Sequence, residues 1–166
     1  MHDELTKVDI EKMQAEIDER KARNASLREN IRAARELGDL SENDEYRSAR
    51  REFGRNNSRI TYLENMIRTA VIIEDHSDSD SVGLFDKVTI YYEDDEEERT
   101  IRLVTTLRND VLSDNISKES PLGVALMGKK AGERVLVKVN DKVSYYILIK
   151  TIEKSDEDPD IPISAF

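Results

Sequence analysis

The chain has 166 residues, of which 37% are hydrophobic and 5% aromatic, and it contains no tryptophan. This composition excludes a single large globular core and fits one or two small domains. The formal net charge of -10 argues against general binding to duplex DNA. No apolar run approaches the ~20 residues that a membrane span needs. Because cysteine is also absent, we expect a cytoplasmic protein with no membrane partner.

Two heptad-patterned segments fill most of residues 1–75, which we interpret as one domain. Their seam positions alternate by three and four residues, the pattern of a coiled coil. The first seam is Ile10, Met13, Ile17, Arg20, Asn24, Leu27, Ile31 and Ala34, and the second is Tyr46, Ala49, Phe53, Asn56, Ile60, Leu63, Ile67 and Ala70. In an antiparallel hairpin, the residue numbers of any two facing positions add up to the same value. For these two seams, that value places the centre of the turn near Leu40. At roughly 1.5 Å per residue the hairpin is a rod of about 45 Å.

One layer of this seam is polar on both sides. Asn24 and Asn56 fall in register, so each amide can satisfy the other across the seam. Such a layer costs stability but fixes the register of the two helices.

The turn of the hairpin carries carboxylates. It reads Gly-Asp-Leu-Ser-Glu-Asn-Asp-Glu-Tyr over residues 38–46, and at this place Asp39 and Glu42 contribute nothing to packing. Ser41 is the predicted N-cap of the second helix, with Asp44 three residues on, which puts Glu42 in the first helical turn. There the helix dipole favours negative charge. The alternative interpretation of these acids is ordinary helix termination and capping.

Arginines gather on the second helix close to the turn. Those at positions 47, 51 and 55 recur every four residues and so share one face. The stripe predicts contact with single-stranded RNA through charge and base stacking. The predicted contact residues are Arg47, Arg50, Arg51, Arg55 and Tyr46. The alternatives are a solvated face that pairs with Glu29 and Glu36, and, for the tyrosine, packing in the seam.

After a polar linker at residues 76–82, the spacing of apolar residues changes from the period of a helix to that of a strand. Residues 83–154 predict a small antiparallel sheet, with strands at 87–92, 99–107, 133–139 and 143–152. Six consecutive acids at 93–98 are expected to form a solvated hairpin loop. A short helix is expected to begin with Ser120 as N-cap and Pro121 at its first position, and to end at Gly128. The acidic tail, 155–166, is expected to be disordered.

Two motifs together resemble the bacterial Gre transcript-cleavage factors, closer to the GreA type. The first is the nine-residue turn at 38–46. The second reads Ile-Ser-Lys-Glu-Ser-Pro-Leu-Gly at 116–123, followed by Ala-Leu-Met-Gly-Lys-Lys at 125–130. The resemblance runs from about Leu5 to Lys154. It implies an α+β fold, in which a long antiparallel coiled-coil hairpin precedes a C-terminal FKBP-like antiparallel sheet with a short helix.

The resemblance also implies a function. A factor of this family is not itself an enzyme: it docks on bacterial RNA polymerase, inserts its hairpin into the secondary channel and stimulates cleavage of the nascent RNA 3′ end in backtracked complexes. By matched position, Asp39 and Glu42 would be catalytic, as ligands of a Mg²⁺ held jointly with the polymerase. The polymerase-docking residues would be Glu119, Ser120, Pro121 and Leu122, with the leucine as apolar anchor. We expect a monomer with no small-molecule substrate.

Asp44 departs from the family pattern, which usually has a small residue at this place. An added acid beside Glu42 either strengthens metal recruitment or repels the RNA phosphate. It therefore keeps open a second function, that of a regulator with the same fold that occupies the channel and inhibits without cleavage. A coiled-coil chaperone or adaptor would instead need apolar residues at the turn. A prolyl isomerase would need an aromatic pocket, and Phe85 is the only phenylalanine between residues 83 and 154.

Overall fold

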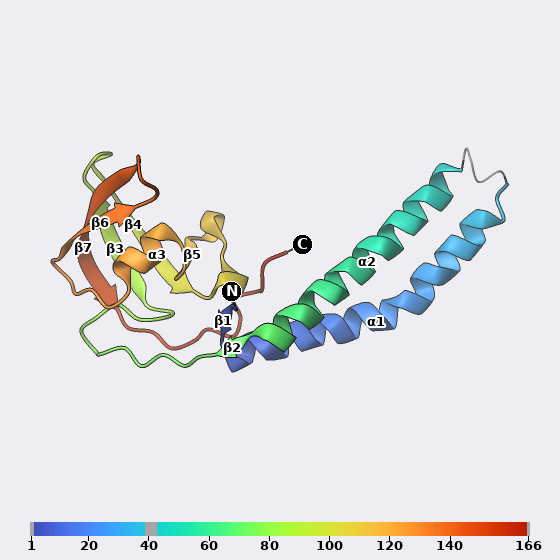
Figure 1. Cartoon of the computed structure of the whole chain (residues 1–166), viewed down its shortest axis with the longest axis horizontal. Helices are drawn as coiled ribbons and strands as arrows, with labels where there is room; N and C mark the ends of the chain where they lie inside the picture. Colours follow the sequence, from blue (N-terminus) through green and yellow to red (C-terminus); the bar gives the residue numbers. More distant parts are fainter. Residues whose placement is uncertain (1, 39–42, 166) are drawn as a thin grey trace. The chain divides into compact units, whose positions relative to one another are not determined.

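The computed structural model describes residues 2–38 and 43–165, and Figure 1 shows a helical hairpin and a sheet-containing unit. The hairpin unit is built on Asp9–Ala70, and the second unit combines Asp3–Val8 with Val71–Ala165. Residues 3–8 therefore belong with the C-terminal unit, although the sequence interpretation had assigned them to the hairpin. Within the described ranges, no helix is both long and apolar enough to cross a membrane.

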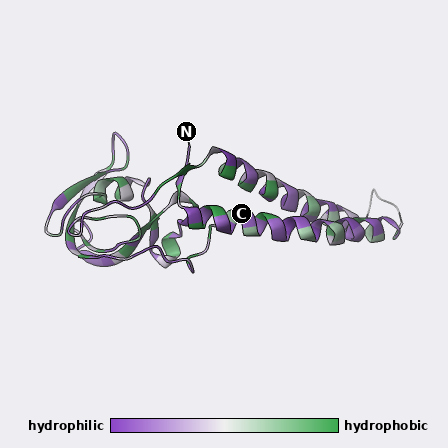
Figure 2. Ribbon diagram, turned by 90° about the horizontal axis from the view of Figure 1, so that it is seen from below, coloured by the Kyte–Doolittle hydropathy of each residue, from purple (hydrophilic) through white to green (hydrophobic). Residues whose placement is uncertain are grey.

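The hairpin consists of two long antiparallel helices, α1 (Lys7–Arg35) and α2 (Asp44–Thr69). Most predicted seam positions are shielded from solvent, and the buried ones are Met13, Ile17, Leu27, Ala34, Asn56, Ile60 and Leu63. Figure 2 shows only short apolar stretches on two largely hydrophilic helices. This thin seam explains why so small a share of the chain is hydrophobic.

The predicted asparagine layer is confirmed. Asn56 is 3% exposed, and its Nδ2 donates to Oδ1 of Asn24 at 3.0 Å and to the main-chain oxygen of Arg20 at 2.9 Å. In turn, Asn24 Nδ2 donates to Oδ1 of Asn57 at 3.2 Å. The amides are satisfied across the seam, so the layer can specify register without leaving these polar groups unpaired.

An ion-pair cluster adjoins this layer. The side chain of Arg59 is only 4% exposed, and it donates to both carboxylate oxygens of Glu16, at 3.0 and 3.1 Å. Nε of Arg20 also donates to Glu16, at 2.9 Å. Burial raises the pKa of Glu16, but the hydrogen bonds and charges of Arg59 and Arg20 outweigh it and leave the pKa below its usual value. The seam therefore contains a connected polar block that is wider than the predicted single layer.

A curled five-stranded sheet forms the C-terminal unit. Its strands are β3 (Lys87–Tyr92), β4 (Glu97–Val104), β5 (Asn115–Ser117), β6 (Arg134–Lys138) and β7 (Ser144–Glu153), in the order β5-β4-β3-β7-β6. The β4–β5 pair is parallel and the other pairs are antiparallel. The sheet is therefore mixed, whereas the sequence predicted an antiparallel one, because β5 was missed.

Apolar side chains from one face of this sheet pack against the short helix α3 (Pro121–Leu126). The core residues include Val88, Ile90, Ile101, Leu103, Leu126, Val137, Ile147 and Ile149. After Val104 the chain leaves the sheet and forms two 3₁₀ turns, Thr106–Arg108 and Val111–Ser113. The strand predicted at 99–107 therefore begins and ends a few residues later than β4 does.

A small parallel pair was not predicted at all. β1 (Glu4–Leu5) pairs with β2 (Val71–Ile72). The main-chain N–H of Val71 donates to the oxygen of Asp3, and that of Ile73 to the oxygen of Leu5, both at 2.9 Å. Strands of two residues show no alternation of apolar and polar side chains, so no periodic signal marks them.

The acidic tail is ordered, which corrects the prediction of disorder for residues 155–165. Ile161 is 7% exposed and packs with Leu84, Phe85 and Val104. Beyond it, the N–H of Ser164 donates to the main-chain oxygen of Leu107 at 2.6 Å. The tail is thus part of the C-terminal unit, where its apolar residues fill a second, smaller core.

A buried arginine holds the tail in place. The side chain of Arg108 has no exposed surface; its Nη2 lies 2.5 Å from Oε2 of Glu157, and its Nη1 donates to the main-chain oxygen of Asp158 at 2.8 Å. The hydroxyl of Thr6 donates to the same Glu157 oxygen at 2.6 Å. The acids of the tail therefore have buried partners, which composition alone does not reveal.

Candidate functional site

The two helices of the hairpin are joined at their ends by one side chain. Asn43 caps α2, since its Oδ1 accepts from the N–H of Tyr46 at 3.0 Å. Its Nδ2 donates to the main-chain oxygen of Ala34, in the last turn of α1, at 2.6 Å. The prediction that Ser41 caps α2 is therefore wrong.

The two predicted catalytic acids, Asp39 and Glu42, lie outside the described residues. Because α2 begins at Asp44, Glu42 precedes the cap, and the prediction that places it in the first helical turn is not met. The acids of that turn are Asp44 and Glu45. The favourable interaction with the helix dipole therefore belongs to Asp44 and Glu45.

Tyr46 lies among cations at the start of α2. The guanidinium carbons of Arg35 and Arg50 are 5.5 and 5.7 Å from the centre of its ring. Nη2 of Arg35 also donates to the phenolic oxygen, over 3.4 Å. This hydrogen bond and the two positive charges outweigh partial burial and lower the pKa of the Tyr46 phenol. The half-buried ring thus has contacts of its own, and a base that stacks on it competes with these arginines.

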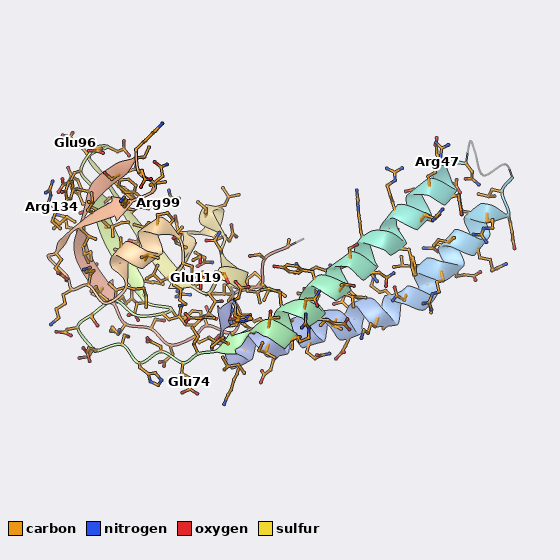
Figure 3. The ribbon with its side chains drawn as sticks, viewed as in Figure 1. Arg47, Glu74, Glu96, Arg99, Glu119 and Arg134 are labelled. Carbon is orange, nitrogen blue, oxygen red and sulfur yellow. The ribbon has the colours of Figure 1, made fainter. Side chains whose placement is uncertain are left out.

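The arginine stripe is exposed, as expected. Arg47, Arg51 and Arg55 all reach solvent from α2, and Figure 3 labels Arg47 near the start of this helix. Nη1 of Arg47 is 3.8 Å from a carboxylate oxygen of Asp44, whose side chain is 96% exposed. Such an exposed pair is weak.

The alternative pairing with acids of α1 involves a different arginine. Arg32 forms ion pairs with both Glu29 and Glu36, the second at 2.6 Å. The hydrogen bond from Arg32 lowers the pKa of Glu29. Since these acids are engaged by a residue of their own helix, they do not neutralise the stripe on α2.

The described residues contain no group of three or more histidine, cysteine, aspartate or glutamate side chains that could hold a metal ion. Asp39, Glu42 and Asp44 nevertheless supply hard oxygen donors of the kind that Mg²⁺ prefers. Of these three acids, Asp44 lies among the described residues, and its side chain is 96% exposed.

The second motif forms the start of α3 as predicted. Oγ of Ser120 accepts from the N–H of Gly123 at 3.0 Å, and Pro121 occupies the first turn. A Cβ on Gly123 would lie 2.2 Å from the main-chain oxygen of Ser117, so only glycine allows α3 to pack this closely on the end of β5.

One predicted docking residue has a different role. Leu122 is 8% exposed and belongs to the core, because α3 turns this side chain onto the sheet. It is therefore not an apolar anchor on the surface, and that prediction is corrected. Glu119, labelled in Figure 3, and Pro121 are exposed. Val124 of α3, which the sequence did not single out, is also exposed, at 66%.

Comparison with models of protein families shows to which family the chain belongs. A model described as the N-terminal part of the transcription elongation factor matches residues 4–72, and one described as the C-terminal part of the transcription elongation factor GreA/GreB matches residues 76–154. The chain belongs to the GreA/GreB family of transcription elongation factors. Both motifs lie inside the matched ranges, whereas the tail from Ser155 onward lies outside them.

Individual relatives agree. The chain is 41% identical over 151 residues to the transcription elongation factor GreA of Thermotoga maritima, covering 90% of this chain and 97% of the relative. It is 43% identical over 146 residues to GreA of Thermosipho africanus, covering 87% and 93%. Among solved structures, GreA factor homolog 1 (Gfh1) of Thermus thermophilus is 24% identical, with a TM-score of 0.43 over 93% of this chain and 100% of that one.

Proposed function

We propose that this GreA-family chain binds bacterial RNA polymerase, inserts its hairpin into the secondary channel and stimulates Mg²⁺-dependent cleavage of the nascent RNA 3′ end in backtracked complexes. The observation that carries the proposal is the pair of hydrogen bonds by which Asn43 joins the start of α2 to the end of α1, directly after the segment of the sequence that contains Asp39 and Glu42. Tyr46 and its arginines adjoin this segment. The polymerase is the enzyme, and this chain completes its site.

In this proposal Asp39 and Glu42 position the reacting groups. Bound Mg²⁺ would supply activation of the attacking water and stabilisation of the leaving oxygen, as in two-metal phosphodiester hydrolysis. Two carboxylates hold Mg²⁺ weakly, so the isolated chain should have little activity of its own.

The exposed arginines would hold the displaced RNA. Arg47, Arg51 and Arg55 lie on the same face of α2, where they can neutralise successive phosphates. Arg50 and Tyr46 would add cation–π or stacking contacts to a base. This arrangement would keep the RNA 3′ end close to the acidic segment.

Docking on the polymerase is assigned to the start of α3. Glu119, Pro121 and Val124 are exposed there, while Ser120 caps the helix and Leu122 anchors it from within. Val124 takes the role of apolar contact that Leu122 cannot fill. Exposed apolar side chains with a polar rim are typical of protein interfaces.

The proposal is tested with stalled, backtracked elongation complexes and Mg²⁺, by following release of 3′ RNA fragments. We expect cleavage with the native chain and with Glu45→Gln, and none with the Asp39→Asn, Glu42→Gln double variant. The Glu45 variant removes a nearby carboxylate and so controls for charge alone. Slowed transcription without cleavage would instead support a regulator that occupies the channel, and absence of polymerase binding would contradict both functions.

A further inference from the structure

A hollow of about 280 Å³ lies between the acidic turn that joins β3 to β4 and the start of β7. Its lining includes the aromatic residues Tyr92 and Tyr145 and the two acids Asp94 and Asp95. Pockets for whole small molecules usually measure 300–1,000 Å³. A hollow below this range suits a single long side chain.

Tyr92 and Tyr145 line this hollow as a pair of neighbouring rings. Their ring centres are 6.0 Å apart and their planes are inclined by 33°. Both side chains are half-buried, so the rings are held by the core and leave part of their surface accessible. Aromatic faces carry negative partial charge and attract cations, and Asp94 and Asp95 add full negative charges at the rim.

In the same region, a tyrosine ring and a carboxylate of the turn already bind a cation together. Arg134 of β6 places its guanidinium 3.6 Å from the ring centre of Tyr146. Two hydrogen bonds, of 2.7 and 2.9 Å, tie this guanidinium to Glu93, an acid of the same turn. Figure 3 labels Arg134 and, on the turn, Glu96. A tyrosine ring and an acid of the turn therefore suffice to hold an arginine within this chain.

The hollow repeats these parts: its lining includes Tyr146, the ring that Arg134 contacts, and adds the rings of Tyr92 and Tyr145. None of the residues that line it is arginine or lysine. Arg99, on β4, lines a neighbouring hollow that shares Tyr92 and Tyr145, and it is bound there to Asp114 at 2.6 Å. We infer that the hollow formed by Tyr92, Tyr145, Asp94 and Asp95 binds the cationic side chain of an arginine or lysine on a partner protein.

The neighbouring hollow favours a protein as the partner. It measures about 310 Å³, is lined largely by apolar side chains such as Ile101 and Ile116, and reaches Ser120 and Pro121 at the start of α3. The cation site is therefore continuous with the proposed docking segment. A partner surface that presents a basic side chain beside an apolar one would fill both hollows. That this partner is the polymerase rests on the proposed function.

The site itself is tested on the full chain without any partner. N-acetyl-arginine amide is titrated while NMR follows the ring resonances of Tyr92 and Tyr145, and N-acetyl-citrulline amide serves as an uncharged probe of the same shape. We expect saturable shifts with a millimolar Kd for the arginine probe and none for the citrulline probe.

Two double variants separate the site from the general acidity of the turn. Asp94→Asn with Asp95→Asn should weaken binding of the arginine probe by about fivefold or more. Glu97→Gln with Glu98→Gln removes the same charge from exposed neighbours outside the hollow, and should leave the Kd nearly unchanged. Equal weakening in both variants, or no saturable shift in the native chain, would overturn the inference.

Polymerase binding is measured separately with the same variants. Weaker binding by the Asp94, Asp95 variant than by the Glu97, Glu98 variant would support the polymerase as the source of the cation. A native chain that binds the arginine probe but no polymerase would leave the site established and would contradict only the proposed function. Unchanged polymerase binding in both variants, beside clear binding of the probe, would overturn the polymerase as source.

Discussion

Glu157 of the tail is the counter-ion of Arg108, a residue whose side chain is fully buried, and their charged atoms are 2.5 Å apart. A buried guanidinium without a partner is strongly destabilising. The pair therefore ties the stability of the C-terminal unit to a segment that lies outside the matched family ranges.

Replacing Glu157 by alanine should destabilise the C-terminal unit by about 3 kcal/mol, because the fully buried guanidinium of Arg108 then loses its ion pair with Glu157. For a unit of this size that corresponds to a fall in Tm of roughly 10 °C or more. Thermal unfolding followed by circular dichroism measures it. Asp156→Ala, at an exposed position of the same tail, is the control, and equal shifts in both variants would show that the ion pair has no special role.

The asparagine layer should respond differently to one and to two substitutions. Asn56→Leu leaves Oδ1 of Asn24 and the main-chain oxygen of Arg20 without their donor, at a cost of about 1–3 kcal/mol. Adding Asn24→Leu makes the layer apolar on both sides and should recover stability while weakening register. Urea denaturation of the two variants tests this, and a double variant less stable than the single one would contradict it.

The stability that Glu16 contributes should depend on pH. Its pKa in the folded chain is lowered, so the unfolded chain binds the proton more readily and the contribution is fully present above the unfolded value, near 4.5. The contribution is lost as pH falls through the lower folded value. Tm measured from pH 7 to pH 3 should therefore show a gap between the native chain and Glu16→Gln that narrows as the pH falls below the unfolded value near 4.5. A gap that persists unchanged would exclude the ion pair as its cause.

Gly123→Ala should loosen α3. The added methyl group would meet the main-chain oxygen of Ser117 at 2.2 Å, and a backbone atom cannot move aside without shifting β5. We expect a loss of about 1–3 kcal/mol, seen as faster amide hydrogen exchange in α3 and β5. Gly54→Ala, where no atom lies within 4 Å of the new Cβ, should be neutral or slightly stabilising. Similar exchange in both variants would contradict the role given to Gly123.

The phenol of Tyr46 should titrate at a lower pH than a free tyrosine. Replacing Arg35 by glutamine removes the hydrogen bond that contributes most to this shift, so the pKa should rise toward 10. NMR of chains with labelled tyrosine, assigned through Tyr46→Phe, follows this titration. An unchanged pKa in the Arg35 variant would show that the contact between the two side chains is not maintained in solution.

The hairpin could be predicted because its information is local. The alternation of three and four residues marks each helix, and the constant sum of facing positions brings Asn24 opposite Asn56, as the structure shows. The N-cap of α2 was missed for a related reason. Ser41 and Asn43 are both good capping residues. Asn43 is favoured because it makes a second hydrogen bond, to Ala34 on the other helix. A contact between the two helices cannot be predicted from the local sequence around the cap.

The C-terminal unit was harder to predict where exposure depends on distant partners. A helix as short as α3 has too few turns for a periodic pattern, so the buried side of Leu122 could not be distinguished from the exposed side of Val124. The tail looked disordered because its composition is acidic, yet its partners Arg102 and Arg108 lie some fifty residues earlier in the chain. Charge complementarity over such separations is visible only in three dimensions.

The pairing of β1 with β2 gives the chain an interrupted architecture. Leu5 and Val71 belong to one small parallel sheet, so the hairpin segment Asp9–Ala70 is a single insertion into the C-terminal unit. A fragment cut at the apparent linker would lose both strands, together with the hydroxyl of Thr6 that binds Glu157. The natural boundary for dissection or grafting is a pair of cuts after Val8 and before Val71, bridged by a short turn. With that boundary, hairpins of other lengths can be exchanged on one unchanged C-terminal unit.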